Sequence, residues 1–354
     1  MSRLSRSAEY SAAQLGIESN NQASDELIRV RPFKDDGGID TAIEWFESVH
    51  PSHSDLSGKR SVPRAAEIVY DGEQISFRYL PCSDDFHWFL TRLRHKYPDS
   101  DVRREEADLI HIDEGDYVAG GEWTLRKHRW WPIRRRDLEG FREDDPYETV
   151  LGDIVDDAVK AGGATGRESV RSVIQVMFRP TTRNWQTGRL LTTNLTELYY
   201  HLNGVYTIHN LAETKREKET ADATEIGNVL DRRAKEKAFD VMIRHLSVGD
   251  DKKAVKHHAE AVGASFASYY NSKTEQAFIV EPSSSPNTLA ETMARREWSG
   301  EKMLLTSLEI APIVHLPPAD ISIAQLDRRQ TKRGEEVPVG SHEHSGYITG
   351  EKDV

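Results

Sequence analysis

The sequence predicts an α+β protein made of two tandem ferredoxin-like domains, over residues 26–115 and 116–300. Three observations carry this prediction. Alternating and helical hydrophobic patterns follow each other twice in the order strand, helix, strand, strand, helix, strand. Asp71-Gly72 lies between two alternating segments, a pattern typical of a hairpin turn. Glycine or proline follows most of the helical segments, as expected at helix ends. We therefore expect, in each half, helices on one face of an antiparallel sheet.

The first half shows its elements through local patterns. Its strands are expected where apolar residues alternate with polar ones, and its helices where apolar residues recur every three or four positions. The expected strands are 27–31, 66–70, 75–80 and 109–112, and the expected helices are 39–50 and 83–97.

The second half repeats this order. Proline suits the first turn of a helix, and Pro146 follows two aspartates there, while Gly162-Gly163 ends the same helix. The apolar stretch 172–178 is nearly continuous and is typical of an interior strand. The expected strands are 122–133, 172–178, 238–244 and 277–280, and the expected helices are 146–162 and 250–268.

Three segments fall outside this repeat. Residues 1–25 are polar and predict a disordered arm, and residues 301–354 predict an extended linker and a polar tail. Residues 186–237 form an insertion in the second domain. Leu191, Leu195, Leu198, Leu202 and Val205 recur there at coiled-coil-like spacing. This pattern fits a projecting helical hairpin or one amphipathic helix packed on its own domain.

The composition narrows the function classes. The formal net charge of −12 argues against a protein that coats nucleic acid with its whole surface, and it fits a salt-adapted cytosol. Cys82 is the only cysteine, so the chain can form no internal disulfide. A lone cysteine is more often a buried apolar residue than a nucleophile. No apolar stretch approaches the length of a membrane span. We expect a cytoplasmic protein, with peripheral attachment to a membrane complex left open.

Several pieces of the chain, taken in order, resemble the N-terminal region of HerA/FtsK-like ATPases of conjugative and type IV secretion systems. The matching pieces are Ile39–His50, Leu93–Val102 with Tyr97-Pro98-Asp99, Asp145-Pro146, Ile174-Gln175 with Pro180 and Trp185, Ala238–Arg244, and Leu308–Pro318. In that family the last piece leads into the motor domain. The resemblance therefore implies the accessory part of such a machine.

The motor itself is not found in the sequence. No G-x-x-x-x-G-K-[ST] phosphate loop occurs, and the nearest candidate, Gly162–Ser169, lacks the lysine and joins a helix to a strand. A phosphate loop needs the reverse order, because the N–H groups at a helix start hold the phosphates. We predict no catalytic residue, no cofactor and no ATPase activity.

The densest basic and aromatic stretch is the candidate binding site. Arginines interleaved with tryptophans can hold a nucleic-acid backbone and stack on bases, or contact an acidic protein. They can also simply alternate between the sheet core and solvent. The predicted residues are Arg126, Lys127, Arg129, Trp130, Trp131, Arg134, Arg135 and Arg136.

Histidine groups predict no metal site. His257 and His258 are adjacent, so on a helix their side chains diverge by about 100° and do not readily share one ion. His342 and His344 lie in the polar tail. We expect all four to be solvated.

The sequence therefore predicts a non-catalytic scaffold or adaptor of a DNA-transfer apparatus. Its expected partner is a separate HerA/FtsK-like ATPase or another copy of the chain, with nucleic acid as a further possible ligand. The alternatives are an enzyme acting on nucleic acid, such as a degenerate nuclease or relaxase, and a plasmid or viral structural protein.

Overall fold

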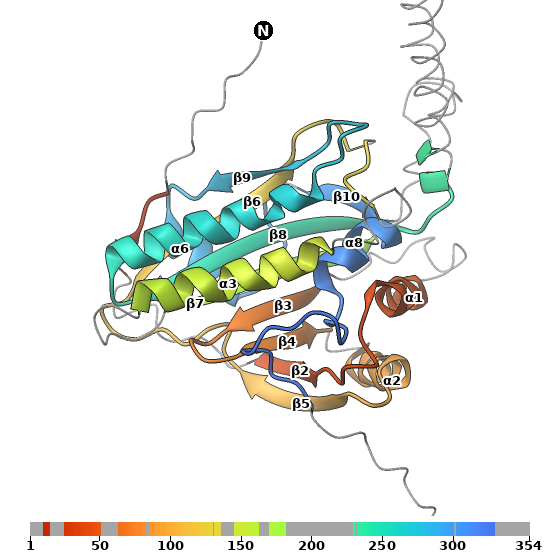
Figure 1. Ribbon diagram of the computed structural model, residues 1–354, viewed down its shortest axis with the longest axis horizontal. Coiled ribbons are helices and arrows are strands. Elements are labelled where there is room, and N and C mark those ends of the chain that lie inside the picture. Colours follow the sequence, from red (N-terminus) through yellow and green to blue (C-terminus); the bar gives the residue numbers. More distant parts are fainter. Residues whose placement is uncertain are drawn as a thin grey trace, which may run out of the picture.

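The computed structural model describes residues 10–14, 25–50, 63–81, 85–129, 131–135, 145–162, 170–181, 229–230, 232–300 and 302–329. These residues form one ten-stranded sheet, whose main strand order is β1-β6-β8-β7-β3-β4-β2-β5, with β9 paired to β6 and β10 to β8 (Figure 1). The strands are β1 (Ala13–Gln14), β2 (Asp25–Arg31), β3 (Arg64–Tyr70), β4 (Ile75–Leu80), β5 (Asp101–Ala107), β6 (Tyr117–Leu125), β7 (Arg171–Pro180), β8 (Ala238–Gly249), β9 (Phe278–Pro282) and β10 (Met303–Thr306).

The prediction of two tandem ferredoxin-like domains is wrong, because the two halves share this sheet. β3 and β7 pair antiparallel from Arg64 with Phe178 to Tyr70 with Ser172. Each of these two strands therefore covers the sheet edge that the other would expose if the halves were separate domains. One hydrophobic core also crosses the junction, where the ring of Phe178 lies 5.1 Å from that of Phe46. Seven strand-to-strand register pairs and a shared core make the halves one folding unit.

The described helices divide unevenly between the two faces of the sheet. Residues of five of them belong to the large core on one face, and Figure 1 shows α3 and α6 lying across that face. Only α7 contributes Leu289, Ala290 and Met293 to the apolar cluster on the other face. The helices are α1 (Ile39–Val49), α2 (Phe86–Lys96), α3 (Pro146–Gly162), α6 (Lys252–Ser265), α7 (Pro286–Ala294) and α8 (Ser307–Val314).

Most locally predicted elements lie close to their expected positions. The main difference is β5, which was expected at residues 109–112 and lies at Asp101–Ala107. Between Asp101 and Glu106 of this charged edge strand, Val102 is the one buried apolar residue, so the strand pattern is weak. Leu109 and Ile110 are buried outside any strand, in the cluster that α7 covers.

The segment expected as a linker begins with two buried elements. β10 pairs with β8, and α8 follows it directly. Glu309 closes a capping box with Thr306 at the start of α8 and forms a buried ion pair with Arg233, at 2.9 and 2.8 Å. Near the C-terminal end of α8, one tyrosine hydroxyl from each half donates to a backbone carbonyl. Tyr79 donates to Val314, and Tyr269 donates to Pro312. α8 therefore joins the two halves from inside the core.

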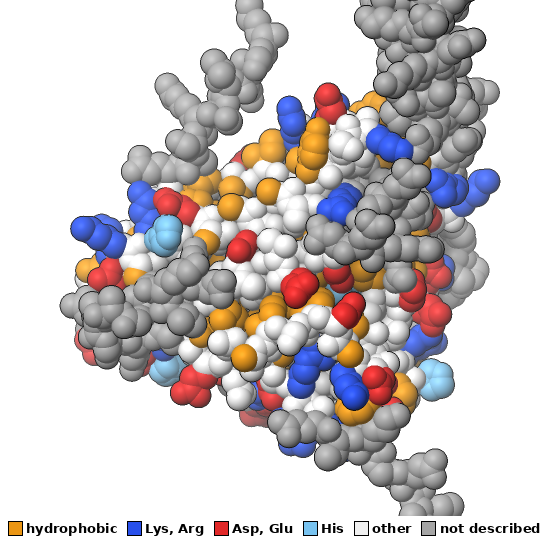
Figure 2. All heavy atoms as spheres, viewed as in Figure 1, with side chains coloured by type: hydrophobic (Ala, Val, Ile, Leu, Met, Phe, Trp, Pro, Cys, Tyr) orange, Lys and Arg blue, Asp and Glu red, His pale blue; other side chains and the backbone are white. Residues whose placement is uncertain are grey.

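Other predictions fall outside the described residues. These are residues 1–9 and 15–24 of the predicted arm, most of the insertion 186–237, Cys82 and the tail after residue 329. Residues 10–14, which were expected to be disordered with the rest of the arm, are ordered, because Tyr10 is buried and β1 pairs with β6. Within the described part of the chain, no helix is both long and apolar enough to cross a membrane. Acidic and basic side chains are interspersed over the face that Figure 2 shows.

Candidate partner-binding site

The predicted basic and aromatic stretch does not form one continuous surface. Arg126 and Arg129 are exposed, whereas the ammonium group of Lys127 contacts Glu275 at 2.8 Å and the carbonyl of Thr274 at 2.9 Å. Trp131 is half-buried. Trp130 and Arg136 lie outside the described residues.

Two further arginines of this stretch turn toward the protein. Arg135 is fully buried and donates to Glu236 at 2.5 Å. Arg134 donates to the carbonyl of Ser268 at 3.3 Å. Arg126 and Arg129 are thus the described arginines of this stretch that face solvent, and a binding role for them stays a prediction.

The predicted histidine pair is also split. His257 is exposed, but His258, expected to be solvated, is buried. Its ring nitrogens lie 2.9 Å from Ser247 Oγ and 2.9 Å from the carbonyl oxygen of Ile154. Among the residues described, no group of three or more histidines, cysteines and acids is arranged to hold a metal ion.

A row of polar residues crosses the sheet on the face that α7 covers. Glu67, Gln175, Arg244 and Glu122 lie directly opposite one another on β3, β7, β8 and β6. Directly paired residues point to the same face. Gln175 donates to Glu67 at 2.9 Å and accepts from Arg244 at 2.6 Å. Burial lowers the pKa of the Arg244 guanidinium to about 10, against the opposing effect of the nearby carboxylates.

The chain segment after α7 is fastened to this row. Arg296 has a left-handed φ of 48° and reaches Glu67 with its Nε at 3.2 Å. Its Nη1 donates to the carbonyl of Ala294 at 3.0 Å. Gln175 donates to the carbonyl of Met293 at 3.0 Å. Both main-chain contacts hold the segment that leads from α7 toward β10.

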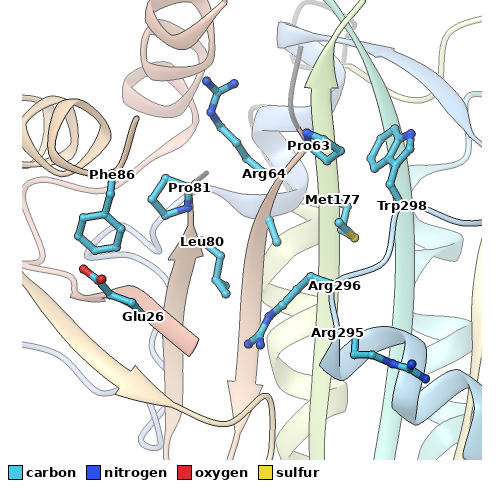
Figure 3. A pocket seen from close by; sticks show the side chains of 11 residues that line it. Glu26, Pro63, Arg64, Leu80, Pro81, Phe86, Met177, Arg295, Arg296 and Trp298 are labelled. Carbon is cyan, nitrogen blue, oxygen red and sulfur yellow. The ribbon is translucent and has the colours of Figure 1, made fainter. Parts of the chain in front are cut away.

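Beside this row lies a hollow of about 580 Å³. Its floor is apolar, formed by Ala65, Leu80 and Met177, which belong to a small core cluster with Trp298 packed against it. Figure 3 shows Met177, Leu80, Arg296 and Trp298 around the opening. A hollow of this size is within the range of ligand sites in proteins.

The rim of the hollow is predominantly basic. Among the residues that the structure describes, Arg64, Arg295 and Arg296 line it, against one acid, Glu26. Arg64 donates to Asp85 and Arg296 to Glu67, so both are held in place. The Arg295 side chain is 63% exposed and pairs at the surface with Glu291 at 3.1 Å and with Glu297 at 3.4 Å. An arginine on an exposed rim can exchange such a pair for a carboxylate of a ligand.

Trp298 adds an aromatic wall. The guanidinium of Arg179 lies 5.0 Å from the centre of its ring, and the ammonium of Lys302 lies 5.6 Å away. Buried tryptophan and arginine at a pocket are the residue types that contribute most to protein interfaces. The apolar floor and basic rim suit a protein segment that carries an apolar side chain beside carboxylates.

Sequence reasoning missed this hollow because its walls come from distant parts of the chain. They lie on β2, β3, β4, α2, β7 and the segment after α7. The sequence contains one local sign of this hollow, two adjacent arginines and a tryptophan within residues 295–298. No secondary-structure pattern drew attention to that segment.

One family model, described as a domain of unknown function (DUF8128), matches residues 5–329. A comparison with curated proteins found no match. The matched range includes both halves of the sheet, α7, β10 and α8.

Proposed function

We propose that this chain, which belongs to the DUF8128 family, is a non-catalytic adaptor that docks onto a HerA/FtsK-like ATPase. The observation that carries this proposal is the arginine-rimmed hollow over an apolar floor. The order of sequence pieces that resembles the N-terminal region of such ATPases supports the choice of partner.

The surroundings of the hollow suit docking. The hydrogen-bonded row of Glu67, Gln175 and Arg244 fixes the sheet beside it, so little order has to be gained on binding. The chain carries a net charge of −12, yet three arginines line this one opening. Arg295, whose own ion pairs are exposed, can exchange them for the carboxylate of a segment that enters the hollow.

The test is complex formation between the full chain and a HerA/FtsK-like ATPase encoded in the same genome, measured by biolayer interferometry. Arg295→Glu reverses an exposed rim charge, and Trp298→Ala removes the aromatic wall. We expect each variant to weaken the complex at least tenfold. Lys253→Glu is the matched control, because Lys253 is exposed on α6 and does not line the hollow. It should bind like the natural chain.

Three results would overturn the proposal. The first is the absence of any complex with the ATPase. The second is equal binding by Arg295→Glu, Trp298→Ala and the control. The third is ATP hydrolysis, or cleavage of labelled single-stranded DNA with Mg²⁺ or Mn²⁺, by the purified chain alone, which would favour an enzyme instead.

A further inference from the structure

The solvent face of α2 carries a second surface with a different chemistry. The helix contains Arg92, Arg94 and Lys96 but no acidic residue. Phe89, Leu90 and Leu93 are buried against the core, so the opposite face points to solvent. Trp88 lies on that face and is 40% exposed, one of the few large apolar side chains that the described part of the protein exposes.

The Trp88 ring forms a cation–π contact with the side chain of Arg92. The guanidinium of Arg92 lies 4.8 Å from the centre of its ring, as expected for residues one helical turn apart. The same guanidinium donates to the carbonyl of Ser48 at 3.3 Å, which anchors it to the end of α1. An aromatic ring is thereby fixed at the surface next to a positive charge.

Helix stability explains only part of this composition. Cations in the last turn complement the helix dipole, which accounts for Arg94 and Lys96. Arg94 also donates to the carbonyl of Val102 at 3.2 Å, and Lys96 pairs with Glu44 at 2.7 Å. Trp88 and Arg92 lie before that turn, and an exposed tryptophan contributes little to the core.

The neighbouring strand places one further arginine beside the helix. Successive side chains of a strand point to opposite faces, and Arg104 lies opposite Ile28, a residue of the core that α2 covers. The Arg104 side chain is 64% exposed, stacks on Phe86 at 5.4 Å and pairs with Glu26. This pair is on the surface and exchanges readily with other anions.

We propose that the α2 face, defined by Trp88 and Arg92, binds single-stranded nucleic acid. A base stacks on the Trp88 ring, and a phosphate contacts the Arg92 guanidinium. Exposed aromatic rings beside arginines are the means by which proteins bind single strands without sequence preference. An acidic protein segment would be attracted by Arg92 as well, but the tryptophans that dominate protein interfaces occupy pockets, whereas Trp88 lies on the solvent face of α2. This site goes beyond the docking function of the hollow.

The rest of the surface limits the size of the site. Because the chain is acidic overall, we expect a strand bound at α2 to contact the protein through only a few nucleotides. Binding should therefore be weak and salt-dependent. For single strands, the logarithm of the binding constant falls with the logarithm of the salt concentration by about 0.7 per phosphate contacted.

The experiment measures fluorescence anisotropy of a labelled 20-nucleotide oligo(dT) with the full chain at low salt. Trp88→Ala should weaken binding at least tenfold, and Trp88→Phe should keep most of it because phenylalanine still stacks. Arg92→Ala should lower the salt slope by about 0.7. Tyr270→Ala is the control, since Tyr270 is 42% exposed and belongs to another part of the fold. Circular dichroism should show the same folded structure for all four variants.

The outcomes separate this site from the hollow. Loss of oligo(dT) binding in Trp88→Ala, with retained binding to the ATPase, supports the proposal. Two results would overturn it: no binding by the natural chain, or equal binding by Trp88→Ala and Tyr270→Ala. A Trp88→Ala variant that loses the ATPase but keeps oligo(dT) would assign the α2 face to a protein partner and also refute it.

Discussion

Replacing Glu309 by glutamine should test whether α8 is part of the folded core. Glu309 and Arg233 are 0% and 1% exposed, and their bidentate ion pair is made of bonds of 2.9 and 2.8 Å. Glu309 also accepts from the backbone N–H of Thr306 at 2.8 Å. Glutamine keeps the shape of this side chain but removes its charge. The guanidinium of Arg233 then stays buried while it loses the charge of the Glu309 carboxylate.

The expected loss of stability is large. Removing one partner of a buried ion pair costs about 3–5 kcal/mol, because the remaining charge stays out of water. Glutamine can retain part of the hydrogen bonding, so we expect about 3 kcal/mol. For a domain of this size that corresponds to a fall in the melting temperature of about 6 °C.

The assay is urea unfolding followed by circular dichroism, with two comparison variants. Glu291→Gln removes the carboxylate of an exposed ion pair with Arg295 and should cost about 0.5 kcal/mol or less. Arg233→Met combined with Glu309→Leu removes both buried charges and should recover a large part of the loss. If Glu309→Gln costs no more than Glu291→Gln, α8 is not buried in solution, and the interpretation of this segment as a linker would return.

Two further predictions concern packing and pH. Gly120→Ala should destabilise the sheet by several kcal/mol, because a Cβ there would lie 2.1 Å from the carbonyl oxygen of His245. In Gly152→Ala the new Cβ meets nothing within 4 Å, so this variant should stabilise α3 by up to about 1 kcal/mol. Urea unfolding of both variants measures the difference. Burial lowers the pKa of His245 to about 3, so between that pH and about 6.5 the unfolded chain binds a proton that the folded chain does not, and stability falls as the pH falls. The double variant His245→Leu with Tyr10→Phe removes both the imidazole and the hydroxyl that lies 3.0 Å from its Nε2. It should lose about 2 kcal/mol less stability between pH 7.5 and pH 5 than the natural chain. An unchanged pH dependence would contradict this.

The sequence predicted elements whose cause is local. The apolar spacing of Ile39–Val49 predicts the helix α1 without reference to the surface against which the helix packs. Asp71 accepts hydrogen bonds from the backbone N–H groups of Glu73 and Gln74 and so stabilises the β3–β4 turn locally. The joining of the halves depends on which edges meet, and that is not local. A trace of it was nevertheless present, since β7 has buried residues on both faces along most of its length. An edge strand of a separate domain does not need this pattern.

The site was harder to predict for a related reason. Glu67, Gln175 and Arg244 are polar residues that directly follow apolar ones within their strands, and such a residue ordinarily indicates a face turned to solvent. Their burial follows only once α7 and the segment to Trp298 cross that face. The same crossing builds one wall of the hollow. Buried polar residues whose partners lie more than 60 positions away carry no local pattern that identifies them.

The two proposed surfaces meet at the first turn of α2, and this has a mechanical consequence. Phe86 lines the hollow, whereas Trp88 faces solvent two residues later. Arg104 stacks on Phe86 and pairs with Glu26, which lines the hollow as well. A segment that fills the hollow therefore contacts the group that positions Arg104 beside the α2 face. Binding of the ATPase and of a single strand should influence each other, and linkage requires that each changes the affinity for the other by the same factor.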